Sequence, residues 1–190
     1  MTIVAGSLTI DDLDVIAPGA FAAAVAPLFE GARGFLGRLA VARPFGSVEA
    51  LFAQAREIAH AMPLDEQIEL IHAHPRLGAA PANVSALSFV EQGYDRADAD
   101  PAATGADAAA VEADALAAEL ERLNVAYEAR FGFRYCVFVA GRSRAALLPG
   151  MVAALEADRA SEIERALDAV IDIARDRYAT LTTGTREGST

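Results

Sequence analysis

Lysine is absent from this chain of 190 residues, and its sixteen basic side chains are all arginines. This absence excludes enzymes that form a Schiff base through lysine and loops that place a lysine on phosphate. A single cysteine, Cys136, excludes an internal disulfide and fits a reducing compartment. The histidines and this cysteine show no metal-ligand spacing, so we expect no metal site.

Long apolar runs are also missing, and so is a basic patch. No stretch approaches the length of a membrane span, and the first thirty residues lack the pattern of a signal peptide. We therefore expect a cytoplasmic protein. The net charge of −11 argues against nucleic acid as a partner. A hydrophobic fraction of 54% with 23% charged residues indicates a soluble globular chain, and the length suits a single domain over residues 1–190.

Apolar residues recur at helical spacing through most of the chain, which predicts an all-α fold of roughly eight helices. Start signals, breakers and apolar stripes place the helices from Thr9, from Pro18, over 35–41, from Ser47 to Pro63, over 64–72, from Ser85 or Ser88, over 109–130, over 144–157 and over 161–181. One β-branched and aromatic run predicts a buried extended segment near 133–140. We expect residues 1–8 and 182–190 to be flexible and the Asp-, Ala- and Gly-rich stretch 95–108 to be a mobile loop.

The stretch from residue 72 to 92 carries the chemistry of the chain. Pro75 disfavours helical geometry at His74, so the imidazole should lie at a helix end beside an irregular loop. Glu91 could accept a hydrogen bond from this ring and favour its protonated form, leaving the other nitrogen to act as a general acid. Gln92 and Ser88 could bind an amide-like or ureido group.

Each motif also has a purely structural interpretation. His-Pro often marks only a helix end, and Ser88-x-x-Glu91 has the form of a capping box. His60, His72 and Cys136 are expected to be structural. Arg134, Arg142 and Arg144 should solvate the ends of the extended segment. Arg175 and Arg177 are two residues apart on a helix, so at most one can face a shared pocket.

Taken together, the motifs are more specific. The chain contains, in order, Arg43-Pro44-Phe45, His74-Pro75, Ser88-x-x-Glu91-Gln92, Leu123-Asn124-x-x-Tyr127, Phe131-Gly132-Phe133 and Arg177 in a closing helix. This order and spacing resemble the OHCU decarboxylase family of urate degradation, where OHCU is 2-oxo-4-hydroxy-4-carboxy-5-ureidoimidazoline. The resemblance extends from about Pro18 to Leu181.

The resemblance implies an all-helical homodimer that needs no cofactor and converts OHCU to (S)-allantoin. It also implies that the catalytic residues are His74, Glu91 and Arg177, with Arg177 anchoring either the departing carboxylate or a ring oxygen. The implied substrate-binding residues are Pro75, Ser88, Phe89, Val90, Glu91, Gln92, Tyr135, Cys136, Val137, Phe138 and Val139.

Three departures from the family pattern leave alternatives open. Arg76-Leu77-Gly78 follows His-Pro where many members have an acidic residue and then Leu-Ala-Gly, Arg134 stands where a proline is common, and the 95–108 insertion is long. The alternatives are a lyase acting on another ureido or hydantoin-like compound and a non-catalytic helical interaction module.

Overall fold

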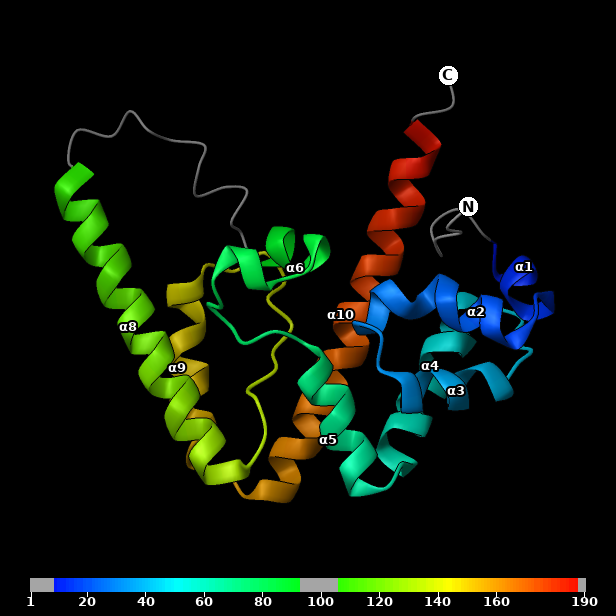
Figure 1. Ribbon diagram of the computed structural model, residues 1–190, viewed down its shortest axis with the longest axis horizontal. Coiled ribbons are helices and arrows are strands. Elements are labelled where there is room, and N and C mark those ends of the chain that lie inside the picture. Colours follow the sequence, from blue (N-terminus) through cyan, green and yellow to red (C-terminus); the bar gives the residue numbers. More distant parts are fainter. Residues whose placement is uncertain (1–8, 93–105, 188–190) are drawn as a thin grey trace. The chain divides into compact units, whose positions relative to one another are not determined.

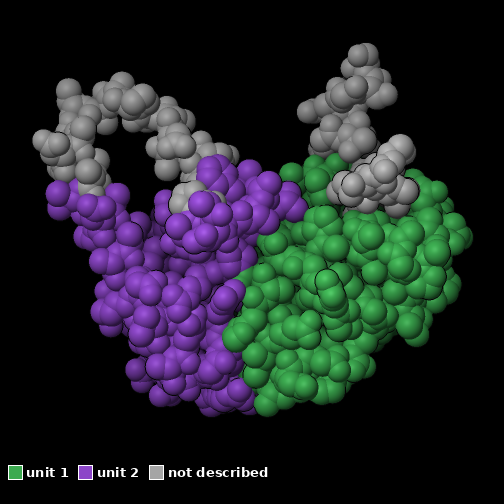
Figure 2. Space-filling view, viewed as in Figure 1, with its two compact units in different colours: residues 1–74, 163–190 green, residues 75–162 purple. Residues whose placement is uncertain are grey.

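The structure, a computed structural model, describes residues 9–92 and 106–187, without the side chains of residues 81, 106–110 and 183–187. Helices dominate these ranges and no strand occurs in them (Figure 1), which confirms the predicted all-α fold. None of the helices in the described ranges is long and apolar enough to cross a membrane. The chain divides into two compact units, residues 1–74 with 163–190 and residues 75–162 (Figure 2).

The first unit contains α1 to α5 and most of the closing helix. Its elements are α1 Ile10–Val15, α2 Pro18–Val25, η2 Ala26–Phe29, α3 Arg33–Val41, α4 Val48–Ala61, α5 Leu64–Ala73 and α10 Arg159–Glu187. The predicted caps are confirmed: Thr9 and Asp12 form a reciprocal capping box, and the Ser47 hydroxyl accepts the backbone N–H of Ala50. Pro18 occupies the first turn of α2, where a missing N–H costs nothing.

Aromatic and aliphatic side chains fill the core of this unit. The rings of Phe29 and Phe35 lie 4.8 Å apart, and those of Phe52 on α4 and Tyr178 on α10 lie 5.9 Å apart. The second contact joins α4 to the closing helix, far from it in sequence. The other large side chains that are buried in this core include Leu13, Phe21, Leu28, Leu39, Leu51, Leu70 and Ile71.

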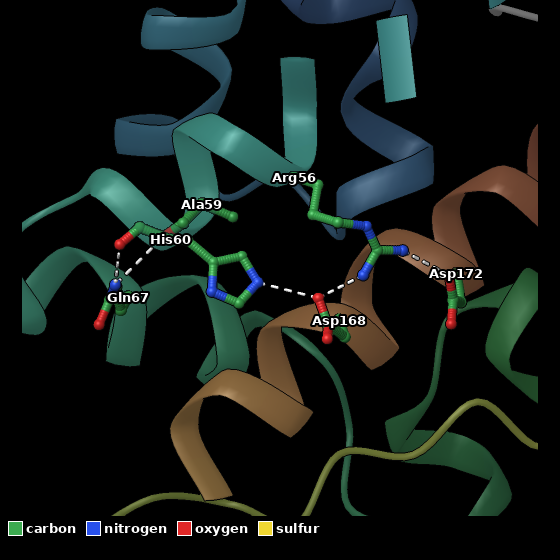
Figure 3. A network of polar contacts seen from close by, with 6 residues as sticks. All are labelled: Arg56, Ala59, His60, Gln67, Asp168 and Asp172. Atoms are coloured by element: carbon green, nitrogen blue, oxygen red, sulfur yellow. Dashed lines mark hydrogen bonds and ion pairs between the residues drawn. The ribbon is translucent and has the colours of Figure 1, made fainter. Parts of the chain in front are cut away.

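A polar network also connects α4 to α10 (Figure 3). The Asp168 carboxylate accepts from Arg56 and lies 2.8 Å from Nε2 of His60, while the other arm of Arg56 reaches Asp172 at 2.7 Å. Gln67 on α5 donates to the His60 carbonyl at 2.9 Å. These side chains are between a third and a half exposed, which agrees with the expectation that His60 is structural.

The second unit is built around α8 Ala106–Phe131 and α9 Arg144–Ala154, which pack together. It also holds the short helices η3 Pro81–Asn83 and α6 Ala86–Glu91. Residues 134–139 are neither helix nor strand, and Tyr135, Cys136 and Val139 are buried, which confirms the predicted extended segment. Tyr127 on α8 makes an edge contact with Tyr135 at 5.1 Å and donates its hydroxyl to the buried Glu162 at 2.7 Å.

The structure refines several predicted boundaries. Of the two serines predicted to open α6, Ser85 is the cap, since its hydroxyl accepts the Ser88 N–H at 3.2 Å. The predicted Ser88–Glu91 capping box is therefore absent, and Ser88 lies inside the helix. Residues 106–108, assigned to a mobile loop, form the first turn of α8, and α10 continues past Leu181 to Glu187. The predictions for residues 1–8, 95–105 and 188–190 lie outside the described residues.

Candidate active site

His74 lies at the end of α5, as its position before a proline predicts. It is the C-cap residue with φ −78° and ψ 142°, in extended geometry, and only 3% of it is exposed. Its Nδ1 lies 3.4 Å from the carbonyl oxygen of Leu70, one turn earlier in the same helix. The helix end therefore buries the ring and orients it at once.

The Leu70 contact selects the tautomer of the neutral ring. A carbonyl oxygen can only accept, so Nδ1 must carry the hydrogen. Nε2 then holds the lone pair in the neutral imidazole. The backbone of α5 thus performs the tautomer selection that the sequence analysis assigned to Glu91.

Burial and, as the second cause, the positive charge of Arg177 lower the pKa of His74 from its usual 6.5 to about 4. The carboxylate of Glu30 and the Leu70 carbonyl oppose these effects without cancelling them. His74 is therefore neutral at pH 7 in the protein without substrate, contrary to the expected protonated ring.

Arg177 projects from α10 and is held by the segment between α2 and α3. Its Nη1 donates to the carbonyl oxygens of Pro27 and Leu28 at 3.0 and 3.3 Å, and its Nη2 pairs with Oε1 of Glu30 at 2.9 Å. The Arg177 side chain is 1% exposed and that of Glu30 14%. Arg175, two residues earlier, is exposed, which confirms that only one of the two arginines points inward.

The loop that follows His74 is anchored within the second unit by α6 and α8. Gln92 accepts the Gly78 N–H at 2.8 Å and donates to the Arg76 carbonyl at 3.2 Å, so its amide binds the loop at two points. Asn124 donates to the Leu77 carbonyl at 3.0 Å. This contact gives a role to the Leu-Asn motif that the sequence analysis left unassigned.

Arg76, the main departure from the family pattern, is also accounted for. Its guanidinium forms a two-point contact with the carboxylate of Glu128 and donates to Glu121 at 3.1 Å. The side chain is thus engaged with α8. The departure at Arg76 therefore has a structural explanation within the second unit.

The remaining predicted site residues divide between α6 and the extended segment of the second unit. Ser88 is buried on α6, while Phe89 and Glu91 are half-buried and Val90 is exposed. Pro75, Val137 and Phe138 are half-buried, and Tyr135, Cys136 and Val139 are buried. Arg142 donates to the Phe138 and Val139 carbonyls, so it closes the end of the segment as expected.

Of the three predicted catalytic residues, the first unit brings His74 and Arg177 together, while Glu91 belongs to the second unit and its convergence with them stays a prediction. Sequence reasoning missed Glu30. A usable signal exists: a carboxylate at the C-terminal end of a helix opposes the helix dipole, so it calls for a nearby cation.

Comparison with known proteins agrees with these features. The family model described as OHCU decarboxylase matches residues 15–179. The chain is 30% identical over 175 residues to the uric acid degradation bifunctional protein PucL of Bacillus subtilis, covering 92% of this chain and 33% of that protein. It is 26% identical over 172 residues to the 2-oxo-4-hydroxy-4-carboxy-5-ureidoimidazoline decarboxylase of Haloferax volcanii, covering 90% and 95%. It therefore spans a third of the Bacillus protein and almost all of the Haloferax protein.

Two solved structures share the fold. An OHCU decarboxylase crystallised in the presence of (S)-allantoin superposes with a TM-score of 0.61 at 22% identity, covering 83% of this chain and 96% of the other. An (S)-allantoin synthase superposes with a TM-score of 0.62 at 18% identity, covering 92% and 54%.

Proposed function

Because the chain belongs to the OHCU decarboxylase family, we propose that it decarboxylates OHCU to (S)-allantoin without a cofactor. One observation carries this proposal. In the first unit, the buried and neutral His74 lies close enough to the buried Arg177 for the guanidinium to lower its pKa. Buried titratable groups with strongly shifted pKa values are typical of catalytic sites.

The reaction defines what the site must do. Breaking the bond between the ring carbon C4 and the carboxylate releases CO2 and leaves an electron pair, which the adjacent imine takes up. The imine nitrogen, which now carries the negative charge, gains a proton from solvent, while the 4-hydroxyl group loses its proton as it becomes a carbonyl and C5 gains a proton. The proton transfers at the hydroxyl and at C5 need a group whose pKa permits transfer, and the developing negative charge needs a fixed positive group.

His74, in its neutral form, can act as the base that takes the proton from the 4-hydroxyl group. Its Nε2 lone pair can accept the hydroxyl proton, and the resulting imidazolium can deliver a proton to C5 from one face, which gives a single enantiomer. The general acid predicted from the sequence is thus formed during turnover. Such a contact supplies about 10²–10⁴-fold of rate enhancement.

Arg177 supplies the fixed positive charge for the anionic substrate. Its guanidinium cannot lose its proton, and it is already immobilised by backbone carbonyls, so little reorganisation accompanies the reaction. We propose that the Glu91 carboxylate accepts a hydrogen bond from His74 during turnover and so favours the protonated form of the ring. The binding surface would comprise Pro75, Ser88, Phe89, Val90, Gln92 and the segment Tyr135, Cys136, Val137, Phe138, Val139.

The test is to generate OHCU from urate with uricase and hydroxyisourate hydrolase, add the protein, and follow circular dichroism. We expect a rapid signal of one allantoin enantiomer, lost in His74→Gln and kept in His72→Gln, an exposed neighbour two residues away. Spontaneous decay gives racemic allantoin, so an unchanged decay without optical signal rejects catalysis and leaves the interaction module as the explanation.

The proposal extends to assembly and location. We propose one functional domain over residues 1–190 that acts as a homodimer in the cytoplasm. Val15 and Val41, 82% and 84% exposed, are apolar side chains that a second copy could cover. Light scattering coupled to size-exclusion chromatography tests the dimer, and a monomeric mass at working concentration contradicts it.

A further inference from the structure

Glu30 occupies a backbone conformation that glutamate rarely adopts. It follows η2 with φ 50° and ψ 28°, in the left-handed region where glycine is the default. Its backbone N–H and that of Gly31 both bond the carbonyl of Ala26, the latter at 2.9 Å, so the turn is closed from the main chain. A turn of this kind needs no carboxylate.

The Glu30 side chain instead meets the guanidinium of Arg177. The Oε1–Nη2 distance is 2.9 Å, and both side chains are largely buried. A charge-assisted contact of this length is among the stronger hydrogen bonds in proteins, and a buried guanidinium requires a compensating charge. The contact with Arg177 therefore explains why this position carries a carboxylate, which the turn itself does not require.

The same turn contributes two further acceptors to the guanidinium. The carbonyls of Pro27 and Leu28 accept from Nη1, so three oxygens from four consecutive residues surround one end of Arg177. Carbonyls at the end of a helix and a carboxylate beside them all favour a cation, and a planar guanidinium can contact all three at once. The position and plane of Arg177 are thereby fixed.

We infer that Glu30 is a positioning residue that fixes Arg177 for the anionic substrate and balances its charge beside His74. This inference rests on the proposed function. Without the carboxylate, Arg177 would lose its contact with Glu30, and His74 would face a cation whose charge Glu30 no longer balances when it must accept a proton. Glu30 would then affect both substrate affinity and turnover, although it acts through two other side chains.

Two substitutions separate the effects of charge and position. In Glu30→Gln the amide oxygen can still accept from Arg177, so we expect kcat about tenfold lower and KM changed by less than about threefold. In Glu30→Gly the turn is relaxed but the contact is lost, so we expect KM to rise about tenfold as well. Glu30→Asp keeps the charge, suits the left-handed conformation better, and should restore part of kcat.

Glu69→Gln, which neutralises an exposed carboxylate of the same unit, is the matched control and should behave as the parent. Parent values of kcat and KM in folded Glu30→Gly, with folding verified by circular dichroism, would overturn the inference. So would a Glu30→Asp enzyme no better than the glycine variant.

A second measurement does not depend on activity. In ¹⁵N spectra of arginine-labelled protein, the Arg177 Nη signals, identified by their loss in Arg177→Lys, should be resolved because the group is rigid. We expect them to broaden in Glu30→Gln and to disappear in Glu30→Gly. Unchanged signals reject the positioning role, even if the parent protein proves inactive on OHCU; an inactive parent with the expected spectra rejects only the proposed function.

Discussion

Gly78 and Leu120 lie so close that no side chain fits between them. A Cβ atom on Gly78 would lie 2.9 Å from Cδ1 of Leu120, and the backbone of Gly78 has φ +78°. The glycine terminates the Arg76-Leu77-Gly78 segment, and its N–H donates to Gln92. The loop after His74 therefore depends on close approach to α8 as well as on hydrogen bonds.

We predict that Gly78→Ala destabilises the protein by about 3 kcal/mol, from left-handed strain and overpacking combined. Gly132 is the matched control, since it has the same φ of +78° but a Cβ atom there would meet open space. Gly132→Ala should cost only about 1 kcal/mol, from strain alone. Urea denaturation of both variants measures the difference, and equal losses would show that the contact with Leu120 is unimportant.

The helix boundaries were predictable from the sequence where the signal is local. Thr9 and Ser47 accept N–H groups of their own first turn, Pro18 occupies a first turn where its missing N–H costs nothing, and Pro75 restricts only its neighbour His74. At α6 two serines three residues apart compete for the cap, and local chemistry does not choose between them. Which of the two serines caps the helix depends on the path of the preceding loop.

The residue types of the candidate site could be predicted from the sequence, but the charge state of His74 could not. A histidine before a proline has an ordinary pKa near 6.5 until its burial is known, and only the fold shows that it is 3% exposed beside Arg177. Glu30 was missed for the same reason. A carboxylate at a helix end indicates that a cation lies nearby, but no spacing rule identifies that cation as Arg177, which lies on the last helix.

The depressed pKa of His74 makes stability depend on pH. The unfolded ring takes up a proton near pH 6.5, but the folded ring does so only near 4, so its stabilising contribution is complete above 6.5. That contribution is lost as pH falls from 6.5 to 4 and amounts to about 3 kcal/mol. We predict that this loss is absent in His74→Gln. Urea denaturation at pH 7 and pH 5 tests the prediction, and parallel curves for parent and variant would contradict it.

The Asp168 network offers a contrast with the buried Arg177. Asp168 bonds Arg56 and His60, but these side chains are 33–46% exposed, so water and salt screen the charges. We expect Asp168→Asn to cost less than about 1 kcal/mol and the cost to shrink at 1 M salt. Arg177→Met should cost about 3–5 kcal/mol at either salt concentration, because it leaves Glu30 without its buried partner. Thermal denaturation at both salt concentrations measures this, and a large salt-independent cost for Asp168→Asn would contradict the assignment.

Arg76 should contribute to activity through the position of the loop. It makes a two-point contact with Glu128, in which the side chains are 31% and 28% exposed. A double-mutant cycle with Arg76→Met and Glu128→Gln should give a coupling energy of about 1 kcal/mol, since both groups are partly shielded from water.

Arg122 and Glu119 form a similar two-point pair on the exposed face of α8, at 2.7 and 2.8 Å, with exposures of 62% and 39%. Their coupling should be only about 0.3 kcal/mol. Arg76→Met should also lower kcat/KM by about tenfold, because small displacements next to a reacting group are costly, whereas Arg122→Met should leave kcat/KM unchanged. If the two arginine variants retain equal activity, the contact with Glu128 serves stability alone and the loop does not need it to place His74.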